Sequence, residues 1–367
     1  MLILFFAFLF LASPRDLAGE LQTTPQAVTG NAPANFSPAE ISDLQKRADS
    51  GDAAAQYALG RAYESGKGIP QRSDQAAIWY RKAAEQGNEK AQNSLGVLYW
   101  SGDGVEKDRS EAVRWYRKAA RQGNANAMFN LGAAYYNGEG VRLNDTFAYA
   151  WFLLSSEAGN SSGRDAAKRS DAESGPAAFG EACRAIGQMY EKGDDLPKNA
   201  MAAAAWYQKA AENGDREAKI NLAALFLNAA DYGQARHWCE AAANEKYPGG
   251  YYCLGYLYQH GSGVDPSAKE ALRWYEQGAN EGNVASMQAL ARMYENGEGT
   301  KVDRVQAFVW YLVAAQRGSQ SAMAEAKRIR SLMTEKEWKD AQRKMPRNLD
   351  PKKVDGFLRG GSSPPSP

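Results

Sequence analysis

The stretch that decides the fold is residues 91–124, AQNSLGVLYWSGDGVEKDRSEAVRWYRKAARQGN. Ala91, Leu95 and Tyr99 recur in it at i, i+4 and i+8, which places all three on one face of a helix. The run GDGV at 102–105 then breaks this helix and reverses the chain. The sequence therefore predicts a helix followed by a sharp turn.

A second helix is expected after the turn. Asp108 is predicted to cap it, and Glu111, three residues later, would complete a capping box. Gly123 is predicted to end this helix in the left-handed conformation, and Asn124 is predicted to cap the helix that follows. Gly96 in the first helix lacks a Cβ, so a neighbouring helix can approach it closely. The apolar face of the second helix is formed by Ala112, Trp115, Tyr116, Ala119 and Ala120.

The same pattern recurs along most of the chain. One marker is a Trp, at Trp79, Trp115, Trp151, Trp206, Trp238, Trp274 and Trp310. A second marker is an aliphatic residue followed by Gly or Ala, at Leu59, Leu95, Leu131, Ile186, Leu222, Leu254 and Leu290. The second marker precedes its Trp by 20 residues in six repeats and by 16 in the fifth. A helix pair this small cannot bury its own apolar faces, so neighbouring pairs must stack.

The pattern Leu-Gly-x-x-Tyr-x-x-Gly-x-Gly-Val, followed by Asp, Ala, Trp-Tyr, Ala-Ala and Gly-Asn, resembles the Sel-one-like repeat, a relative of the tetratricopeptide repeat. The resemblance covers residues 51–322. It implies an all-α fold, a right-handed α-α superhelix (solenoid) of about seven helix-pair repeats. Family members serve as adaptors and scaffolds. Bacterial members include exported regulators of envelope signalling, exopolysaccharide production and host interaction, so a non-catalytic protein–protein interaction scaffold is expected.

The two ends of the chain differ from the repeats. Residues 2–12 are apolar and uncharged, too short to span a bilayer but similar to the core of a secretory signal peptide. We therefore expect a signal peptide at 1–19 and a periplasmic or secreted protein, with an uncleaved membrane anchor as the alternative. A flexible linker at 20–36 and an N-terminal helix at 37–50 would follow. Near the other end, a disordered tail is expected at 346–367.

The expected repeats fall into two blocks. Repeats 1–3 would occupy 51–159 and repeats 4–7 would occupy 181–322, separated by an insert at 160–180 that splits the solenoid. The fifth repeat lacks four residues of the turn, which makes its local twist differ. Residues 323–345 have helical periodicity without the motif, as expected of a C-terminal capping helix.

Composition argues against several function classes. Lys and Arg number 44 against 43 Asp and Glu, and these charges are interspersed, so neither nucleic acid nor an anionic membrane is an expected partner. With two His and three Cys, no metal site is expected. The Gly-x-Gly loops follow helices rather than strands, so they are turns and not phosphate cradles. We expect no catalytic residue and no cofactor. The alternative is an envelope enzyme-like module that binds or hydrolyses β-lactam or cell-wall ligands. One subgroup of the family is linked to such ligands, but its pattern of one Cys pair per repeat is absent here.

The cysteines leave two alternatives open. Cys239 and Cys253 lie on helices that should be adjacent, so a disulfide closing a loop of about 14 residues is geometrically feasible. They would otherwise be two small buried apolar residues. Cys183, on a first helix near the insert, is left over in either case.

Helical phase predicts the binding surface. Positions two before, two after and five after the Leu marker point away from the motif face of each first helix. These positions include Tyr57, Arg61, Asn93, Val97, Trp100, Phe129, Ala133, Tyr136, Arg184, Ile220, Leu227, Tyr252 and Tyr256. In related solenoids the first helices line the concave surface, where exposed aromatic residues mark recognition of a protein or peptide partner. Trp100, Phe129 and Tyr136 are the predicted principal contacts. The alternative is that tight curvature simply buries these residues.

Overall fold

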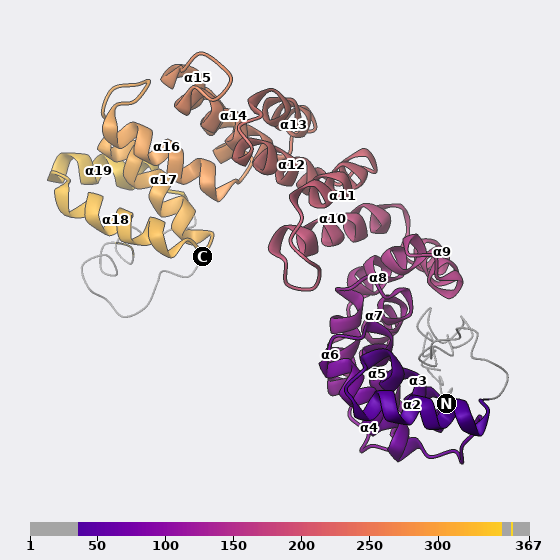
Figure 1. Ribbon diagram of the computed structural model, residues 1–367. Helices are drawn as coiled ribbons and strands as arrows, with labels where there is room; N and C mark the ends of the chain where they lie inside the picture. The colour runs from indigo at the N-terminus through magenta and orange to yellow at the C-terminus, as the bar shows by residue number, and fades with distance from the viewer. Residues whose placement is uncertain (1–35, 347–353, 355–367) are drawn as a thin grey trace, which may run out of the picture. The chain divides into compact units, whose positions relative to one another are not determined.

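The computed structural model describes residues 36–346 and Val354 (Figure 1). The predicted signal peptide, most of the linker and most of the tail lie outside the described residues. Within them the regular structure is entirely helical, which confirms the all-α prediction. The eighteen described helices are α2 (Pro38–Asp49), α3 (Ala53–Ser65), α4 (Ser73–Glu85), α5 (Glu89–Ser101), α6 (Arg109–Ala120), α7 (Ala125–Asn137), α8 (Asp145–Glu157), α9 (Ser161–Ser174), α10 (Pro176–Lys192), α11 (Ala200–Glu212), α12 (Arg216–Asn228), α13 (Tyr232–Asn244), α14 (Pro248–His260), α15 (Ala268–Asn280), α16 (Val284–Asn296), α17 (Arg304–Gln316), α18 (Gln320–Leu332) and α19 (Glu335–Lys344). None of the described helices is both long and apolar enough to cross a membrane.

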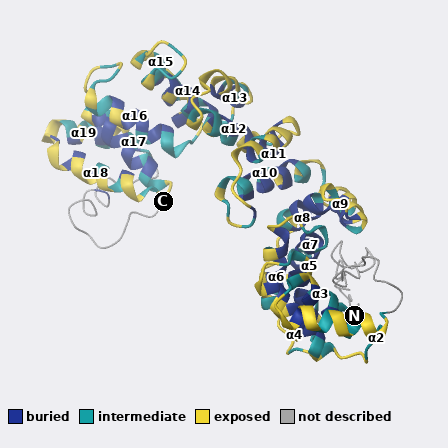
Figure 2. Cartoon of the chain, viewed as in Figure 1, coloured by how far each residue is buried: buried dark blue, intermediate teal, exposed yellow. Residues whose placement is uncertain are grey.

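The helices stack as seven pairs. The pairs are α3/α4, α5/α6, α7/α8, α10/α11, α12/α13, α14/α15 and α16/α17, and the two members of each pair pack on one another. The chain forms two compact units, one ending at Asn213 and the other beginning at Gly214. Within each unit the second helix of one pair packs on the first helix of the next, and α8 packs on α10 although α9 lies between them in the chain. Most helices therefore combine buried and exposed positions (Figure 2).

The two helices of a pair touch at a glycine. A Cβ built on Gly96 would lie 2.6 Å from Cε1 of Tyr116, a residue of α6 with no exposed surface. This confirms the predicted close approach at Gly96. The same glycine–ring contact recurs at Gly60 with Tyr80, Gly132 with Phe152, Gly187 with Tyr207 and Gly255 with Tyr275. The glycine is therefore required by the distance between the helices, and not by a turn.

Helix ends follow the predicted caps, with one correction. The Asp108 carboxylate accepts the N–H of Glu111 at 2.9 Å, and Gly123 has a φ of +92°. The predicted capping box at Asp108 does not form. The N–H of Asp108 donates instead to the carbonyl of Tyr99, and the Glu111 carboxylate pairs with Arg114 at 2.8 Å. Because the backbone N–H of Asp108 is already bonded inside the turn, it cannot donate to the Glu111 carboxylate, as a capping box requires.

The added segments differ from the predictions in two respects. The insert forms α9, capped by Asn160 and packed on α8, but the boundary between the compact units falls after Asn213 and not at the insert. The C-terminal capping segment is two helices rather than one, because Thr334 accepts the N–H of Glu337 and the Glu337 carboxylate accepts the N–H of Thr334. This reciprocal capping box starts a new helix. The N-terminal helix begins with the same device, Ser37 with Glu40.

Gly96→Ala tests the glycine contact. The added methyl group would overlap the ring of Tyr116, so we expect a loss of about 1–3 kcal/mol of stability, measured as a lower urea midpoint by circular dichroism. Gly233→Ala in α13 is the control. Its Cβ would meet no atom closer than 3.7 Å, and alanine favours the helix, so stability should stay level or rise. Equal midpoints for the two variants would contradict the contact.

Candidate functional site

Three of the predicted contact residues are buried in the first unit. Trp100 is 8% exposed and its ring lies 6.3 Å from that of Tyr116. Phe129 is 4% exposed and lies 5.7 Å from Phe152. Asn93 is fully buried, where its Oδ1 accepts a hydrogen bond from Asn130. These rings fill the space between paired helices, so the predicted role of Trp100 and Phe129 as exposed contacts is corrected. For them the burial alternative holds, as it does for Ala133.

The other predicted residues of the first unit are half-buried. The ring of Tyr57 lies 5.7 Å from that of Tyr80, in the same arrangement as Phe129 and Phe152. The Tyr136 hydroxyl donates to Glu173 of the insert helix α9 at 3.3 Å. Arg61, Val97 and Arg184 have intermediate exposure. The aromatic residues of this unit thus serve internal packing, and the structure does not bring them together into one open surface.

The second unit is different, because four predicted residues meet there around one cavity. Ile220, Leu227, Tyr252 and Tyr256 line a space of about 370 Å³. The remaining lining residues are Ala224, Asn228, Tyr232, Cys253 and Ser262. Tyr256 is 36% exposed and Tyr232 is 39% exposed, so two of the rings are open to solvent. We call these nine residues the tyrosine cavity.

Three helices build the tyrosine cavity. Ile220, Ala224 and Leu227 follow one another at spacings of four and three residues, which places them on one face of α12. Tyr252 and Tyr256 are one turn apart on α14, and Tyr232 is the first residue of α13. The cavity is therefore formed where the outward faces of two successive first helices meet the start of the second helix between them.

Two of the three tyrosines are positioned by a neighbouring ring. The ring of Tyr252 lies 5.8 Å from that of Tyr275, and the ring of Tyr256 stacks on His260 at 4.1 Å. His260 is oriented in turn by a hydrogen bond of 2.9 Å between its Nδ1 and the carbonyl of Tyr256. Sequence reasoning missed Tyr232, because phase on the first helices cannot point to a residue of a second helix. The sequence feature that could have pointed to Tyr232 is the shortened turn of the fifth repeat, which places this residue directly beside α12.

The polar groups around the tyrosine cavity are available to a ligand. Among the described residues, the hydroxyls of Tyr232, Tyr252, Tyr256 and Ser262 and the side-chain amide of Asn228 have no hydrogen-bond partner. All nine lining residues are uncharged. The arrangement can therefore donate and accept several neutral hydrogen bonds beside aromatic surface, but it offers no counter-charge.

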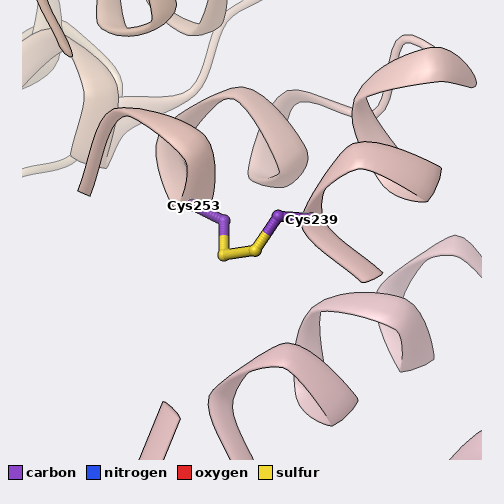
Figure 3. The surroundings of a disulfide bond; sticks show 2 residues. All are labelled: Cys239 and Cys253. Atoms are coloured by element: carbon purple, nitrogen blue, oxygen red, sulfur yellow. A yellow bond between two sulfur atoms is a disulfide. The ribbon is translucent and has the colours of Figure 1, made fainter. Parts of the chain in front are cut away.

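A disulfide lies beneath the tyrosine cavity. Cys239 of α13 and Cys253 of α14 are bonded, with Cα atoms 5.6 Å apart (Figure 3). The sequence had left this bridge open against two unbonded cysteines. Cys239 occupies the position after the repeat's Trp, where the other repeats have Tyr or Phe. Cys239 is fully buried, and its partner Cys253 lines the cavity. Cys183, the leftover cysteine, is buried in α10.

A second cavity, of about 560 Å³, lies farther along the same unit. It is formed by α16 and α18, with Tyr311 of α17, and is lined by charged and amide side chains. Arg328 donates to Glu295 at 2.7 Å and to Glu325 at 2.7 Å, which neutralises most of this charge and raises the pKa of Arg328. Burial, together with these carboxylates, raises the pKa of Tyr311 to about 12, so its hydroxyl stays protonated at neutral pH. We call this the charged cavity.

Both histidines pack against aromatic rings. The ring of His237 meets that of Trp238 edge-on at 5.1 Å, and His260 supports Tyr256. Within the described part of the chain, no group of three or more His, Cys, Asp or Glu side chains could hold a metal ion.

Stacked helix pairs with an outward-facing cavity define a helical-repeat protein of the solenoid class. The chain belongs to the Sel1 repeat family, whose model matches residues 53–88, 89–124, 125–160, 180–215, 217–247, 249–283 and 284–319. This confirms the seven repeats expected from the two markers. Proteins of this family are generally protein-interaction scaffolds.

Individual relatives are more distant. The chitin synthase regulator SKT5 of Saccharomyces cerevisiae is 33% identical over 93 residues, which cover 23% of this chain and 13% of that protein. The crystal structure of a protective antigen of uropathogenic Escherichia coli strains, which displays an SLR fold, is 30% identical with a TM-score of 0.43, covering 88% of this chain and 68% of the antigen. A Sel1 repeat protein from Oxalobacter formigenes is 25% identical with a TM-score of 0.39, covering 79% and 80%.

Removing the disulfide should destabilise the second unit. The bond closes a loop with a sequence separation of 14, so the double variant Cys239→Ser, Cys253→Ser should lose roughly 3 kcal/mol, seen as a lower thermal midpoint. Dithiothreitol should lower the midpoint of the unmodified protein similarly and leave the double variant unaffected. A reductant effect of the same size on both proteins would show that it does not act through this bond.

Proposed function

We propose that this chain is a non-catalytic scaffold that binds a partner protein through the tyrosine cavity. The observation that carries the proposal is the clustering of Tyr232, Tyr252 and Tyr256, with unpaired hydroxyls, around an open space. Exposed aromatic residues that cluster beside a cavity are typical of recognition surfaces, and tyrosine is enriched among the residues that dominate binding energy. Membership of an interaction-scaffold family agrees with this role.

The proposed partner is a protein or peptide segment and not a nucleic acid. The chain has a net charge of only +1, and the residues that line the cavity are uncharged. A nucleic-acid surface would need several unpaired Lys or Arg side chains on one face to neutralise phosphates. Aromatic rings with neutral hydrogen-bonding groups suit a polypeptide better.

Tyr256→Ala tests the proposed interaction surface. The chain is immobilised, extract of the source organism is passed over it, and proteins retained reproducibly are quantified by mass spectrometry. Loss of a central aromatic contact typically weakens binding by at least tenfold, so a true partner should be strongly depleted on the variant. Arg114→Ala, an exposed change on α6, is the matched control and should retain the partner. Equal retention by both variants would exclude the tyrosine cavity as the interaction surface.

We propose further that the scaffold works outside the cytoplasm, as a periplasmic or secreted protein of a bacterial envelope. Two observations support this location. Disulfides persist in oxidising compartments and are rare in the cytosol, and Cys239 and Cys253 are bonded. Residues 2–12 have the apolar character of a signal-peptide core. Regulation of envelope signalling, exopolysaccharide production or host interaction would suit a scaffold in this place.

Cell fractionation with mass spectrometry of the N-terminus tests the location. The mature protein should begin near Glu20 and be recovered outside the cytoplasm, because the apolar segment would be removed on export. An intact Met1 on soluble cytoplasmic protein would contradict export. An intact N-terminus in the membrane fraction would favour the uncleaved anchor instead.

A further inference from the structure

We propose that the tyrosine cavity binds an uncharged, proline-containing segment of the partner in the polyproline II conformation. This inference rests on the proposed function, because it names the chemistry of the partner at the same surface. Four features of the cavity lead to it: the absence of charge in its lining, its unpaired hydroxyls, the spacing of its tyrosines, and its contrast with the charged cavity.

The lining excludes a charged segment. All nine residues are neutral, and Lys219 and Arg236 on two of the same helices are already paired, Lys219 with Glu245 and Arg236 with Glu240 at 2.7 Å. An ionised side chain that entered would lose hydration without gaining a counter-charge, which is strongly unfavourable. The bound segment is therefore uncharged over the part that contacts the cavity.

The unpaired hydroxyls favour an extended segment over a helix. A helix satisfies its own backbone carbonyls and would leave the hydroxyls of Tyr232, Tyr252, Tyr256 and Ser262 without partners. A polyproline II segment makes no internal hydrogen bonds, so its carbonyls are free to accept from these groups. Strand addition, the other mode for extended peptides, needs an open sheet edge, and the described residues contain no sheet.

The tyrosine rings favour proline at the contact positions. Proline-rich segments dock on aromatic-lined grooves because the flat pyrrolidine ring packs on aromatic rings and the conformation is already formed before binding. Tyr252 and Tyr256 are one helical turn apart on α14, roughly 6 Å along its axis. This separation matches about two residues of polyproline II, which rises about 3.1 Å per residue. Because polyproline II has three residues per turn, the two tyrosines of α14 can contact successive residues within a single turn of a proline-containing segment.

The charged cavity provides the internal comparison. Its lining contains Arg292, Glu295, Glu325 and Arg328, whereas equivalent positions in the tyrosine cavity carry apolar or tyrosine side chains. A neutral proline-containing segment should therefore bind at the tyrosine cavity alone. Gln288 lines the charged cavity and donates to Ser321 at 2.8 Å, so Gln288→Ala changes that cavity without removing a charge.

The test is calorimetric titration of the full chain with an acetylated and amidated oligoproline of ten residues. Binding should be measurable for the unmodified protein and for Gln288→Ala, and weakened tenfold or more in Tyr256→Ala. Tyr256→Phe keeps the ring and loses only the hydroxyl, so it should fold normally and bind roughly two- to tenfold more weakly. A ten-residue Gly-Ser peptide, and an oligoproline with two central Glu residues, should bind at least tenfold more weakly than the oligoproline.

Several outcomes would overturn the assignment. They are equal oligoproline affinity in the unmodified protein and Tyr256→Ala, binding of the Gly-Ser peptide as tight as that of oligoproline, and binding of a neutral glucose oligosaccharide in place of oligoproline. Residues 362–367, SSPPSP, are themselves an uncharged proline-containing run, so a variant ending at Gly361 is titrated in parallel. Tighter binding by that variant would identify the occupant as this chain's own segment and overturn assignment to a partner.

The two proposals fail differently. If extract proteins are retained through Tyr256 but oligoproline does not bind, the interaction surface stands and its proposed chemistry is wrong. If oligoproline binds through Tyr256 but no extract protein depends on that residue, the chemistry of the cavity stands and the proposed scaffold function at this surface fails.

Discussion

The contact between a glycine of one helix and an aromatic ring of its partner sets the geometry of five of the seven repeats. At Gly96 the ring of Tyr116 occupies the space that a Cβ would need, and the same holds at Gly60 and Tyr80. Since a ring packed directly on backbone holds two helices at one short separation, each pair presents its apolar faces to the next pair in the same way. Stacking of the pairs, and burial of the rings, depend on this separation.

The fifth repeat departs from this constraint, and the candidate site lies there. Ala223 stands where the other first helices mostly have glycine, and Cys239 stands where they face a ring. Cys239 is fully buried, and its sulfur is bonded to Cys253 of the next pair, which itself lines the tyrosine cavity. A covalent bond thus replaces part of the packing that the ring provides elsewhere. Stability and recognition are consequently coupled in one small region.

Equivalent aromatic residues differ in exposure between the two units. Phe129 and Tyr252 occupy equivalent positions on their first helices and pack on equivalent rings, Phe152 and Tyr275. Phe129 is buried, whereas Tyr252 retains an edge toward the cavity. Equivalent positions in a repeat protein can therefore differ in exposure while they keep the same ring contact.

The local structure can be read from the sequence alone: the helix pairs, their number, most of their caps and the need for a glycine at Gly96. These features depend on residues close together in the chain, whose spacing reveals them directly. The sequence also limits the candidate surface to outward positions that include Ile220, Leu227, Tyr252 and Tyr256. Which of these outward positions are open to solvent depends on the packing of the folded chain. Helical phase gives the direction of a side chain, but exposure depends on what packs beside it in the fold: Tyr116 packs beside Trp100, whereas Tyr256 stays 36% exposed.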